Sequence, residues 1–330
     1  MASLPRVFIS RVLPPEALAF VEGRVEIVAG PQERPATRDE LVAGLREADA
    51  FVPMLSDRVD AALLEGAPRL KIVANYAAGF NNVDLAAAES LGVWVTNTPE
   101  ATTDATADLA MGLIIAAGRH FLDSERFLRE GRFDAWSPTR FLGLLLSGAT
   151  LGIVGMGRIG KALARRAGAF GMRVVYHSRR RLAPEEERAL EVSSMPLDEL
   201  LSLSEVVSLH CPLTEQTRHL IDARAIERMK PGALLVNTSR GPVVDEEALA
   251  RALHEGRLGG AALDVYEQEP RLHPLLATAP RTLLLPHVGT STLQTRTSMA
   301  EKALGDVLRV LEGRPPRFAV NAPTAPRSGG

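Results

Sequence analysis

A glycine-rich turn near the middle of the chain is the feature that most restricts the fold. Residues 150–154 form a short apolar run, which is typical of a buried parallel strand. Glycines then follow at the spacing G-x-G-x-x-G, and apolar residues beyond them recur on one face of a helix. In this strand-to-helix context the spacing predicts a site for the diphosphate of a dinucleotide. The residues of this predicted site are Gly155, Gly157, Arg158, Ile159 and Gly160.

The three glycines have separate roles in this prediction. Gly155 permits the tight turn, Gly157 lets the backbone approach the diphosphate, and Gly160 lets helix and strand pack closely. The alternative is a glycine-rich turn that binds no ligand.

The composition restricts the class of protein. The chain has 330 residues, which suggests two domains, and a formal net charge of −2, which favours neither nucleic acid nor an anionic membrane. The single cysteine, Cys211, excludes an intrachain disulfide and a cysteine zinc cluster, and we expect no metal site. No apolar run approaches the roughly 20 residues of a membrane span. The start of the sequence does not resemble a signal peptide, so we expect a cytoplasmic protein.

Two series of alternating strands and helices predict the architecture. In the first series, strands are expected at 6–10, 25–28, 50–54, 70–74 and 93–96. In the second, strands are expected at 150–154, 173–176, 206–210, 233–237, 260–263 and 282–285. We therefore predict an α/β protein with two doubly wound parallel-sheet domains. A Rossmann dinucleotide-binding domain of residues 100–289 would interrupt a flavodoxin-like domain of residues 1–99 and 290–330, to which a helix over 291–311 returns.

A long segment of small and apolar residues links the two series. Residues 105–119 predict a helix that is apolar on nearly all sides, and such a helix is buried between layers, subunits or domains. Residues 131–147, which follow it, are expected to be irregular.

Three residues of complementary chemistry follow the last three predicted strands. Arg240, Glu269 and His287 lie beyond strand ends, where ligands of open α/β sheets bind. Reduction of a 2-keto acid needs these types: arginine binds the carboxylate and polarises the ketone, and histidine protonates the forming alcohol. A carboxylate orients the imidazole and favours its protonated form. Singly, each could be an ordinary surface or structural residue; together we interpret them as catalytic.

Several ordered motifs resemble those of the D-isomer-specific 2-hydroxyacid dehydrogenases. They lie at residues 151–160, 210–214 (His-Cys-Pro-Leu-Thr), 236–241 (Val-Asn-Thr-Ser-Arg-Gly), 262–265 (Ala-Leu-Asp-Val), 269–270 (Glu-Pro) and 286–289 (Pro-His-Val-Gly). The similarity covers nearly the whole chain and is closest to the glyoxylate/hydroxypyruvate reductases. It implies NAD(P)H-dependent reduction of a small 2-keto acid, with Arg240, Glu269 and His287 as the catalytic set.

The resemblance also implies what surrounds that set. Ala78 and Gly79 would offer backbone N–H groups to the substrate carboxylate, although their loop could be a simple glycine turn. The substrate-binding residues implied are Leu55, Ser56, Ala78, Gly79, Arg240 and His287, and the interrupted domain would be the substrate-binding one. The further cofactor-binding residues implied are Thr106, Cys211, Pro212, Thr238, Asp264 and Gly289. Of these, Asp264 would accept a hydrogen bond from the nicotinamide carboxamide.

The resemblance implies a homodimer. The apolar segment 105–119 fits the dimer and hinge region of the family. Trp136, in the context Trp-Ser-Pro, matches a tryptophan that approaches the partner subunit's active site in the glyoxylate reductase branch. Ordinary interface packing is the alternative role for this side chain.

The segment after the second strand of the dinucleotide-binding domain predicts the cofactor. An acid about 20 residues past the glycine motif usually binds the ribose 2′-hydroxyl of NAD. Here residues 177–181 read His-Ser-Arg-Arg-Arg, and no acid appears before Glu185. Hydroxyl and guanidinium groups suit a 2′-phosphate, so we predict that NADP(H) is preferred and NAD(H) is usable. The predicted contacts are Ser178, Arg179 and either Arg180 or Arg181; the alternative is a solvated basic loop.

Two other functions are compatible with these motifs. One is a D-2-hydroxyacid dehydrogenase for a larger keto acid. The other is a dinucleotide-sensing, corepressor-like binding protein, a class that can keep the same three catalytic residues. The absence of long recruitment tails and of a basic DNA-facing segment counts against the second function. Turnover of glyoxylate or hydroxypyruvate with NADPH separates an enzyme from a binding module.

Overall fold

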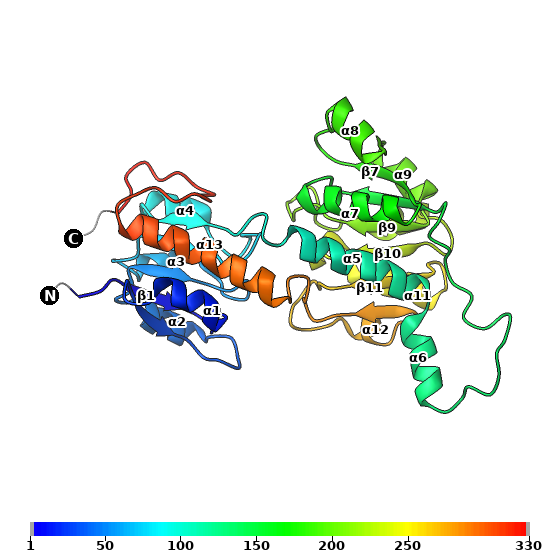
Figure 1. Cartoon of the computed structure of the whole chain (residues 1–330), viewed down its shortest axis with the longest axis horizontal. Coiled ribbons are helices and arrows are strands. Elements are labelled where there is room, and N and C mark those ends of the chain that lie inside the picture. The colour runs from blue at the N-terminus through cyan, green and yellow to red at the C-terminus, as the bar shows by residue number, and fades with distance from the viewer. Residues whose placement is uncertain (1–2, 328–330) are drawn as a thin grey trace. The chain divides into compact units, whose positions relative to one another are not determined.

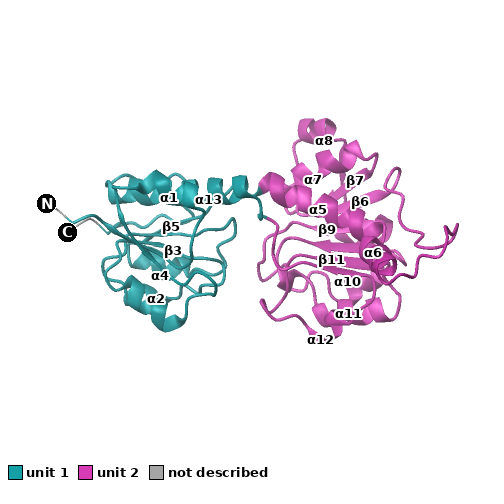
Figure 2. Cartoon of the chain, turned by 60° about the horizontal axis from the view of Figure 1, so that its bottom comes forward, with its two compact units in different colours: residues 1–102, 290–330 teal, residues 103–289 magenta. Residues whose placement is uncertain are grey.

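The computed structural model describes residues 3–327 and consists of two compact α/β units (Figures 1 and 2). Residues 1–102 and 290–330 form unit 1, and residues 103–289 form unit 2. Both sheets are wholly parallel, as the alternation of strands and helices predicts, so the doubly wound α/β class is confirmed.

Unit 1 contains a five-stranded sheet in the order β2-β1-β3-β4-β5. Its strands are β1 (Arg6–Ile9), β2 (Glu26–Ala29), β3 (Ala50–Val52), β4 (Ile72–Ala74) and β5 (Trp94–Thr96). Its helices are α1 (Pro15–Leu18), the 3₁₀ turn η1 (Ala19–Val21), α2 (Arg38–Leu45), α3 (Ala61–Glu65), α4 (Leu85–Ser90) and α13 (Leu293–Leu311).

Alternate residues of each strand face opposite layers of helices. In β1, Val7 and Ile9 pack with α1 and α13, whereas Phe8 packs with α2 and α3 on the other face. Burial on both faces explains why the central strands β3 and β4 are short, continuous apolar runs.

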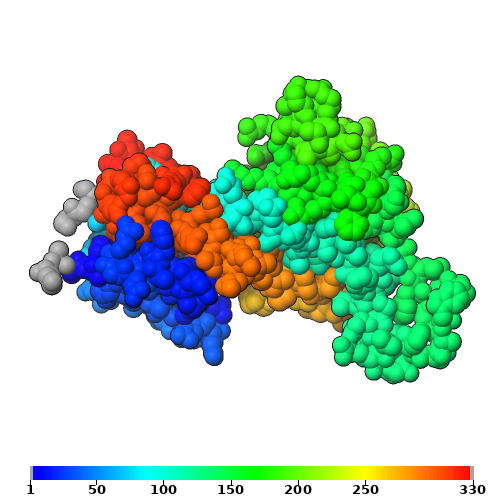
Figure 3. Space-filling view, in the orientation of Figure 1, coloured from blue at the N-terminus to red at the C-terminus, as the bar shows by residue number. Residues whose placement is uncertain are grey.

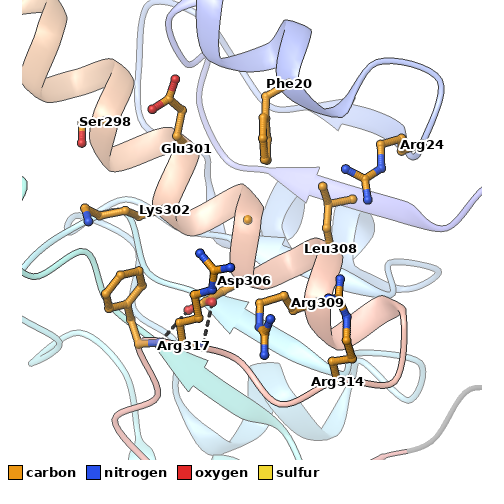
Figure 4. A pocket seen from close by; sticks show the side chains of 12 residues that line it. Phe20, Arg24, Ser298, Glu301, Lys302, Asp306, Leu308, Arg309, Arg314 and Arg317 are labelled. Atoms are coloured by element: carbon orange, nitrogen blue, oxygen red, sulfur yellow. Dashed lines mark hydrogen bonds between the residues drawn. The ribbon is translucent and has the colours of Figure 1, made fainter.

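The C-terminal segment packs back onto unit 1. Asp306 of α13 accepts hydrogen bonds from the backbone N–H groups of Arg317 and Phe318, at 2.7 and 2.9 Å. A hollow of about 370 Å³ lies between α13, η1 and this segment (Figure 4). Several cations that line it are engaged within the chain: Arg24 and Arg314 pair with Glu312, and Lys302 lies over the ring of Phe318. These contacts indicate that the hollow is part of how the C-terminal segment packs.

Unit 2 contains a seven-stranded sheet in the order β12-β11-β10-β9-β6-β7-β8. Its strands are β6 (Thr150–Val154), β7 (Arg173–His177), β8 (Val192–Ser194), β9 (Val206–Leu209), β10 (Leu234–Asn237), β11 (Gly260–Leu263) and β12 (Thr282–Leu284). Its helices are α5 (Thr103–Gly118), α6 (Phe121–Arg129), α7 (Arg158–Ala169), α8 (Pro184–Leu190), α9 (Leu197–Leu203), α10 (Ala223–Arg228), η2 (Gly241–Val243), α11 (Glu246–His254) and α12 (Pro274–Ala277). One face of the sheet packs against α5 and α7, and the other against α9, α10 and α11.

Helix α5 is buried on one face only within the chain. Its buried face, which includes Ala107, Ala110 and Ile114, packs on unit 2, mainly against α7. On the opposite face Asp104 and Asp108 are exposed, and both pair with Arg166 of α7. Within one chain α5 is therefore buried on one face, and burial of its other face between subunits or domains stays a prediction.

An arm projects from unit 2 and consists of α6 and residues 130–147 (Figures 1 and 3). Its α6 residues were not among the predicted elements, whereas the segment from 131 to 147 is irregular as expected. Large apolar side chains of the arm are exposed, and Trp136 exposes 80% of its surface. Across residues 3–327 the structure has no helix with the length and apolar character needed to cross a membrane.

Candidate active site

The glycine turn between β6 and α7 has the geometry that its spacing predicts. Gly155 has φ of +100°, and a Cβ there would lie 2.5 Å from the backbone nitrogen of Cys211. A Cβ at Gly160 would lie 2.3 Å from the carbonyl oxygen of Gly155, so this glycine permits close packing of helix and strand. A Cβ at Gly157 would meet no atom within 4 Å, which leaves open space above the backbone at that residue. Side chains at Gly155 and Gly160 would therefore collide with neighbouring backbone atoms, whereas the space above Gly157 is open for a ligand.

The first turn of α7 suits an anion. Gly157 precedes the helix and has no side chain to cap its N-terminal N–H groups, and Arg158 and Ile159 form the first turn. Uncapped N–H groups and the positive end of the helix dipole together stabilise a bound phosphate.

Two buried polar atoms that follow strands of the same sheet lack partners among the described residues. They are Oγ1 of Thr238, directly after β10, and Nδ1 of His210, directly after β9. Buried polar atoms are costly without hydrogen bonds, so both fit a polar ligand at this edge of the sheet. His210 was part of a predicted motif but was not itself predicted as a site residue. Burial lowers the pKa of His210 to about 4, which keeps its imidazole neutral.

Cys211, which precedes Pro212, lies against the glycine turn through its backbone rather than through a reactive side chain. The thiol of Cys211 is buried, and burial raises its pKa to about 11. A protonated thiol is a weak nucleophile, so this cysteine contributes packing beside Gly155.

The basic segment after β7 contains both free and engaged guanidinium groups. Arg179 and Arg180 are exposed and make no hydrogen bond or ion pair within residues 3–327, and Ser178 is half-buried beside them. Arg181 instead donates two hydrogen bonds of 2.9 Å to the carboxylate of Glu187 in α8. This pairing lowers the pKa of Glu187 to about 2. Either Arg180 or Arg181 is predicted to contact the 2′-phosphate of NADP(H). Arg181 is engaged by Glu187, so Arg180 is the one whose guanidinium is available.

His287 and Glu269 form a hydrogen-bonded pair in unit 2. Nδ1 of His287 lies 2.9 Å from Oε2 of Glu269, and Oε1 of Glu269 accepts the backbone N–H of Tyr266 at 3.0 Å. Burial opposes ionisation of Glu269, but the hydrogen bond from His287 and the charge of Arg240 hold its pKa below its usual value. An ionised Glu269 requires a proton on Nδ1. Nε2 of His287 has no partner within the described residues, so it is the nitrogen available to a substrate.

Asp264 holds the loop that carries His287. Its two carboxylate oxygens accept the backbone N–H groups of Val288 and Gly289, at 2.7 and 2.8 Å. Asp264 is 1% exposed, and Oγ1 of Thr106 in α5 donates to the carbonyl oxygen of Gly289 at 3.4 Å. His287 itself has a left-handed backbone with φ of +55°, which the two hydrogen bonds next to it help to hold. Asp264 therefore has a positioning role that its sequence motif did not reveal.

Arg240 lies between β10 and η2, beside the loop that carries Glu269. A Cβ at Gly241 would lie 1.8 Å from the carbonyl carbon of Tyr266, so the two loops are in direct contact. The Arg240 side chain donates to the carbonyl oxygen of Ser239 at 2.7 Å and forms no ion pair within residues 3–327. Burial lowers its pKa, while the charge of Glu269 acts in the opposite direction. A half-buried guanidinium without a carboxylate partner is suited to bind an anionic ligand.

The residues implied for substrate binding in unit 1 lie at the carboxyl ends of adjacent strands. Leu55 and Ser56 follow β3, and Ala78 and Gly79 follow β4. The two loops are linked through the backbone, because Tyr76 N–H donates to the carbonyl oxygen of Pro53 at 3.1 Å. Across residues 3–327 no group of three or more His, Cys, Asp and Glu side chains is arranged to hold a metal ion.

Comparison with known proteins agrees with this geometry. Residues 111–289 match the family model described as D-isomer specific 2-hydroxyacid dehydrogenase, NAD binding domain. The glyoxylate reductase of Thermococcus onnurineus is 44% identical over 321 residues, which cover 96% of each chain.

Solved structures are similar over almost the whole chain. A crystal structure of a protein from Thermus thermophilus has a TM-score of 0.90 at 43% identity and covers 96% of this chain and 99% of that chain. The NADPH-dependent glyoxylate/hydroxypyruvate reductase of Sinorhizobium meliloti, in complex with NADP and malonate, has a TM-score of 0.84 at 30% identity and covers 99% and 100%. The chain belongs to the D-isomer-specific 2-hydroxyacid dehydrogenase family.

Proposed function

We propose that this protein reduces glyoxylate or hydroxypyruvate to the corresponding 2-hydroxy acid and prefers NADPH to NADH. The observation that carries the proposal is the 2.9 Å contact between His287 Nδ1 and Glu269 Oε2, beside an arginine without an ion-pair partner. The names of the Thermococcus and Sinorhizobium relatives support a small 2-keto acid as the substrate. The enzyme is thus an NAD(P)-dependent oxidoreductase that acts on a CH–OH group.

Each catalytic side chain has one task in this mechanism. Arg240 binds the substrate carboxylate and polarises the keto group. Nε2 of His287 donates a proton to the keto oxygen as it becomes a hydroxyl, and the ionised Glu269 stabilises the positively charged imidazole. The bound dinucleotide supplies the hydride. In the oxidative direction His287 accepts the proton.

The proposed substrate-binding domain comprises residues 1–99 and 290–330, all of which belong to unit 1, and residues 100–289 are proposed to bind the dinucleotide. The backbone N–H groups of Ala78 and Gly79 bind the substrate carboxylate, and Leu55 and Ser56 line the other side. The dinucleotide diphosphate binds at the N-terminus of α7, supported by the open space above Gly157. The residues proposed for the nicotinamide half are Thr106, Thr238, Asp264 and Gly289, and those for the adenosine half are Ser178, Arg179, Arg180, Cys211 and Pro212.

A panel of keto acids tests the function. With NADPH in excess, we expect kcat/KM to be highest for glyoxylate or hydroxypyruvate and lower for pyruvate and longer keto acids, as measured by the loss of reduced-nicotinamide absorbance. A maximum at a longer keto acid would favour the alternative dehydrogenase. Binding of NADPH without turnover of any keto acid would favour a dinucleotide-sensing binding protein.

Paired kinetics test the cofactor preference. Replacing Arg179 and Arg180 with alanine should lower kcat/KM for NADPH about tenfold or more and leave that for NADH almost unchanged, because two cations near a 2′-phosphate are lost. Arg188→Ala is the matched control, since Arg188 is an exposed arginine of α8 that pairs with Glu185. A wild-type kcat/KM for NADH that equals or exceeds that for NADPH would contradict the preference.

We propose a homodimer in which Trp136 approaches the partner subunit's active site, and the exposed apolar surface of the arm supports the dimer contact. Its exposed apolar residues are Phe121, Leu122, Leu128, Phe133, Trp136, Phe141, Leu142 and Leu145. Apolar surface of this extent on one segment is typical of a protein interface. A second copy of the chain would cover it.

Charge introduced into the arm tests the dimer. Leu128→Glu combined with Phe133→Glu should weaken the dimer by about 100-fold or more, measured by analytical ultracentrifugation, because the substitutions bury unpaired charge at an apolar interface. Leu203→Glu, at an exposed leucine of α9, is the control. Trp136→Ala separates the two roles of the tryptophan: a higher KM for glyoxylate in an intact dimer indicates the active site, and a weaker dimer with an unchanged KM indicates packing.

A further inference from the structure

Asn82 connects the two loops that flank the proposed substrate carboxylate site of unit 1. The loops are residues 53–57, after β3, and residues 75–82, after β4. The side-chain nitrogen of Asn82 lies 3.2 Å from the carbonyl oxygens of both Met54 and Asp57, which share one of its two N–H groups; the other faces Asn75. Asn82 thus belongs to the 75–82 loop and binds the 53–57 loop at two residues, Met54 and Asp57.

Asn75 completes the connection from the buried side. Its nitrogen lies 3.2 Å from Oδ1 of Asn82, and the nitrogen of Asn82 lies 3.0 Å from Oδ1 of Asn75, so the two amides pair reciprocally. The nitrogen of Asn75 also donates to the carbonyl oxygen of Gly79 at 2.8 Å. Asn75 is 0% exposed and Asn82 is half-buried, and hydrogen bonds on the side shielded from water are stronger than exposed ones.

The 53–57 loop is itself firmly held, so a side chain that binds it can fix the position of the 75–82 loop. The buried carboxylate of Asp57 accepts the hydroxyl of Ser10 and, at 2.7 Å, the backbone N–H of Met54. The loop is therefore fixed to β1, and Asn82 fixes the second loop against it.

The chemistry requires an amide at position 82. The side chain must donate to carbonyl oxygens and accept from Asn75 in one planar group, which only asparagine among side chains of this size can do. An aspartate of the same shape would place acceptor against acceptor at Met54 and Asp57.

We propose that Asn82, paired with Asn75, is a positioning residue that sets the separation of the Leu55–Ser56 and Ala78–Gly79 segments. This separation is the width available to the substrate carboxylate, so the inference rests on the proposed function for what the loops bind. The amides act through the loops and are not catalytic residues, because their polar atoms are used within the chain.

Hydrogen exchange tests the connection without reference to activity. In Asn82→Ala and in the isosteric Asn82→Asp, backbone amides of both loops should exchange about tenfold faster than in the wild type, measured by mass spectrometry of peptides. Asn321→Ala is the matched control, because Asn321 makes two side-chain hydrogen bonds to the backbone of Val93 and Val95 in unit 1, outside both loops. Faster exchange confined to residues 75–82, or equal in Asn321→Ala, would overturn the proposal.

Steady-state kinetics test the consequence for substrate. Asn82→Ala, which adds no charge, should raise KM for glyoxylate about tenfold while KM for NADPH stays constant, because only the carboxylate site is widened. Combining Asn82→Ala with Asn75→Ala should add little, since the two amides act as one unit. A KM for glyoxylate that rises no more than in Asn321→Ala would refute the positioning role. If the wild type does not reduce glyoxylate at all, the proposed function fails, and the exchange measurement still decides whether Asn82 couples the loops.

Discussion

Replacing His287 with alanine is expected to lower kcat for glyoxylate by about 10²- to 10⁴-fold, the contribution typical of a positioned general acid. The imidazole has its Nδ1 committed to Glu269 and its Nε2 without a partner among the described residues, so loss of the ring removes the proton donor. The Kd for NADPH should change little, because the proposed site for its diphosphate is the glycine turn before α7. Single-turnover kinetics and cofactor titration measure the two quantities separately.

A matched histidine separates chemistry from general destabilisation. His254 is an exposed histidine of α11 whose Nε2 lies 3.2 Å from the carbonyl oxygen of Leu275, and His254→Ala should leave kcat unchanged. Glu269→Gln keeps a side chain of the same shape beside the imidazole but removes the charge, so it should lower kcat while leaving Kd for NADPH intact. An unchanged kcat in His287→Ala would show that another group donates the proton.

The class of fold could be predicted because its causes are local. Buried parallel strands are short apolar runs, and the turn at Gly155 and Gly160 needs glycine wherever a Cβ would strike backbone. Strand β8 was missed because Val-Ser-Ser has one apolar residue in three, and its pairing with β7 supplies the rest of its stability. The one-sided burial of α5 also depends on tertiary packing. Small residues occupy both faces of this helix, so its sequence does not indicate which face is buried.

The placement of the proposed catalytic set at one edge of a sheet could be predicted, because one topological rule locates its members. Arg240, Glu269 and His287 each follow a strand of one parallel sheet, and the carboxyl ends of such strands meet at one edge. The residues that hold the loops could not be predicted in the same way. Asp264 binds backbone groups 24 and 25 residues further along the chain, and Asn82 binds carbonyl groups 28 and 25 residues before it. Such pairings depend on loop conformation, for which neither periodicity nor motif spacing gives a signal.

Arg240→Lys is expected to lower kcat/KM for glyoxylate by about 10²-fold or more, although the formal charge is kept. A guanidinium presents a planar fork that binds a carboxylate through two hydrogen bonds, whereas an ammonium is a point charge. Burial lowers the pKa of Arg240, and the same surroundings would neutralise a lysine more readily because its pKa starts lower. Steady-state kinetics measure the loss, and Arg224→Lys, at an exposed arginine of α10, is the control.

Chemical rescue distinguishes the loss of the guanidinium from a change in the surrounding loop. In Arg240→Ala, added guanidinium ion should restore part of the turnover of glyoxylate, and an alkylammonium ion at the same concentration should restore less, because only the first reproduces the planar donors. Two features of Arg240 favour rescue. Its side chain forms no ion pair with the described residues, so its removal leaves no carboxylate unpaired. The backbone of the neighbouring Gly241 is fixed against Tyr266, so the loop should keep its shape. A mild effect of Arg240→Lys would instead mean that the backbone N–H groups of Ala78 and Gly79 hold the substrate carboxylate without the arginine.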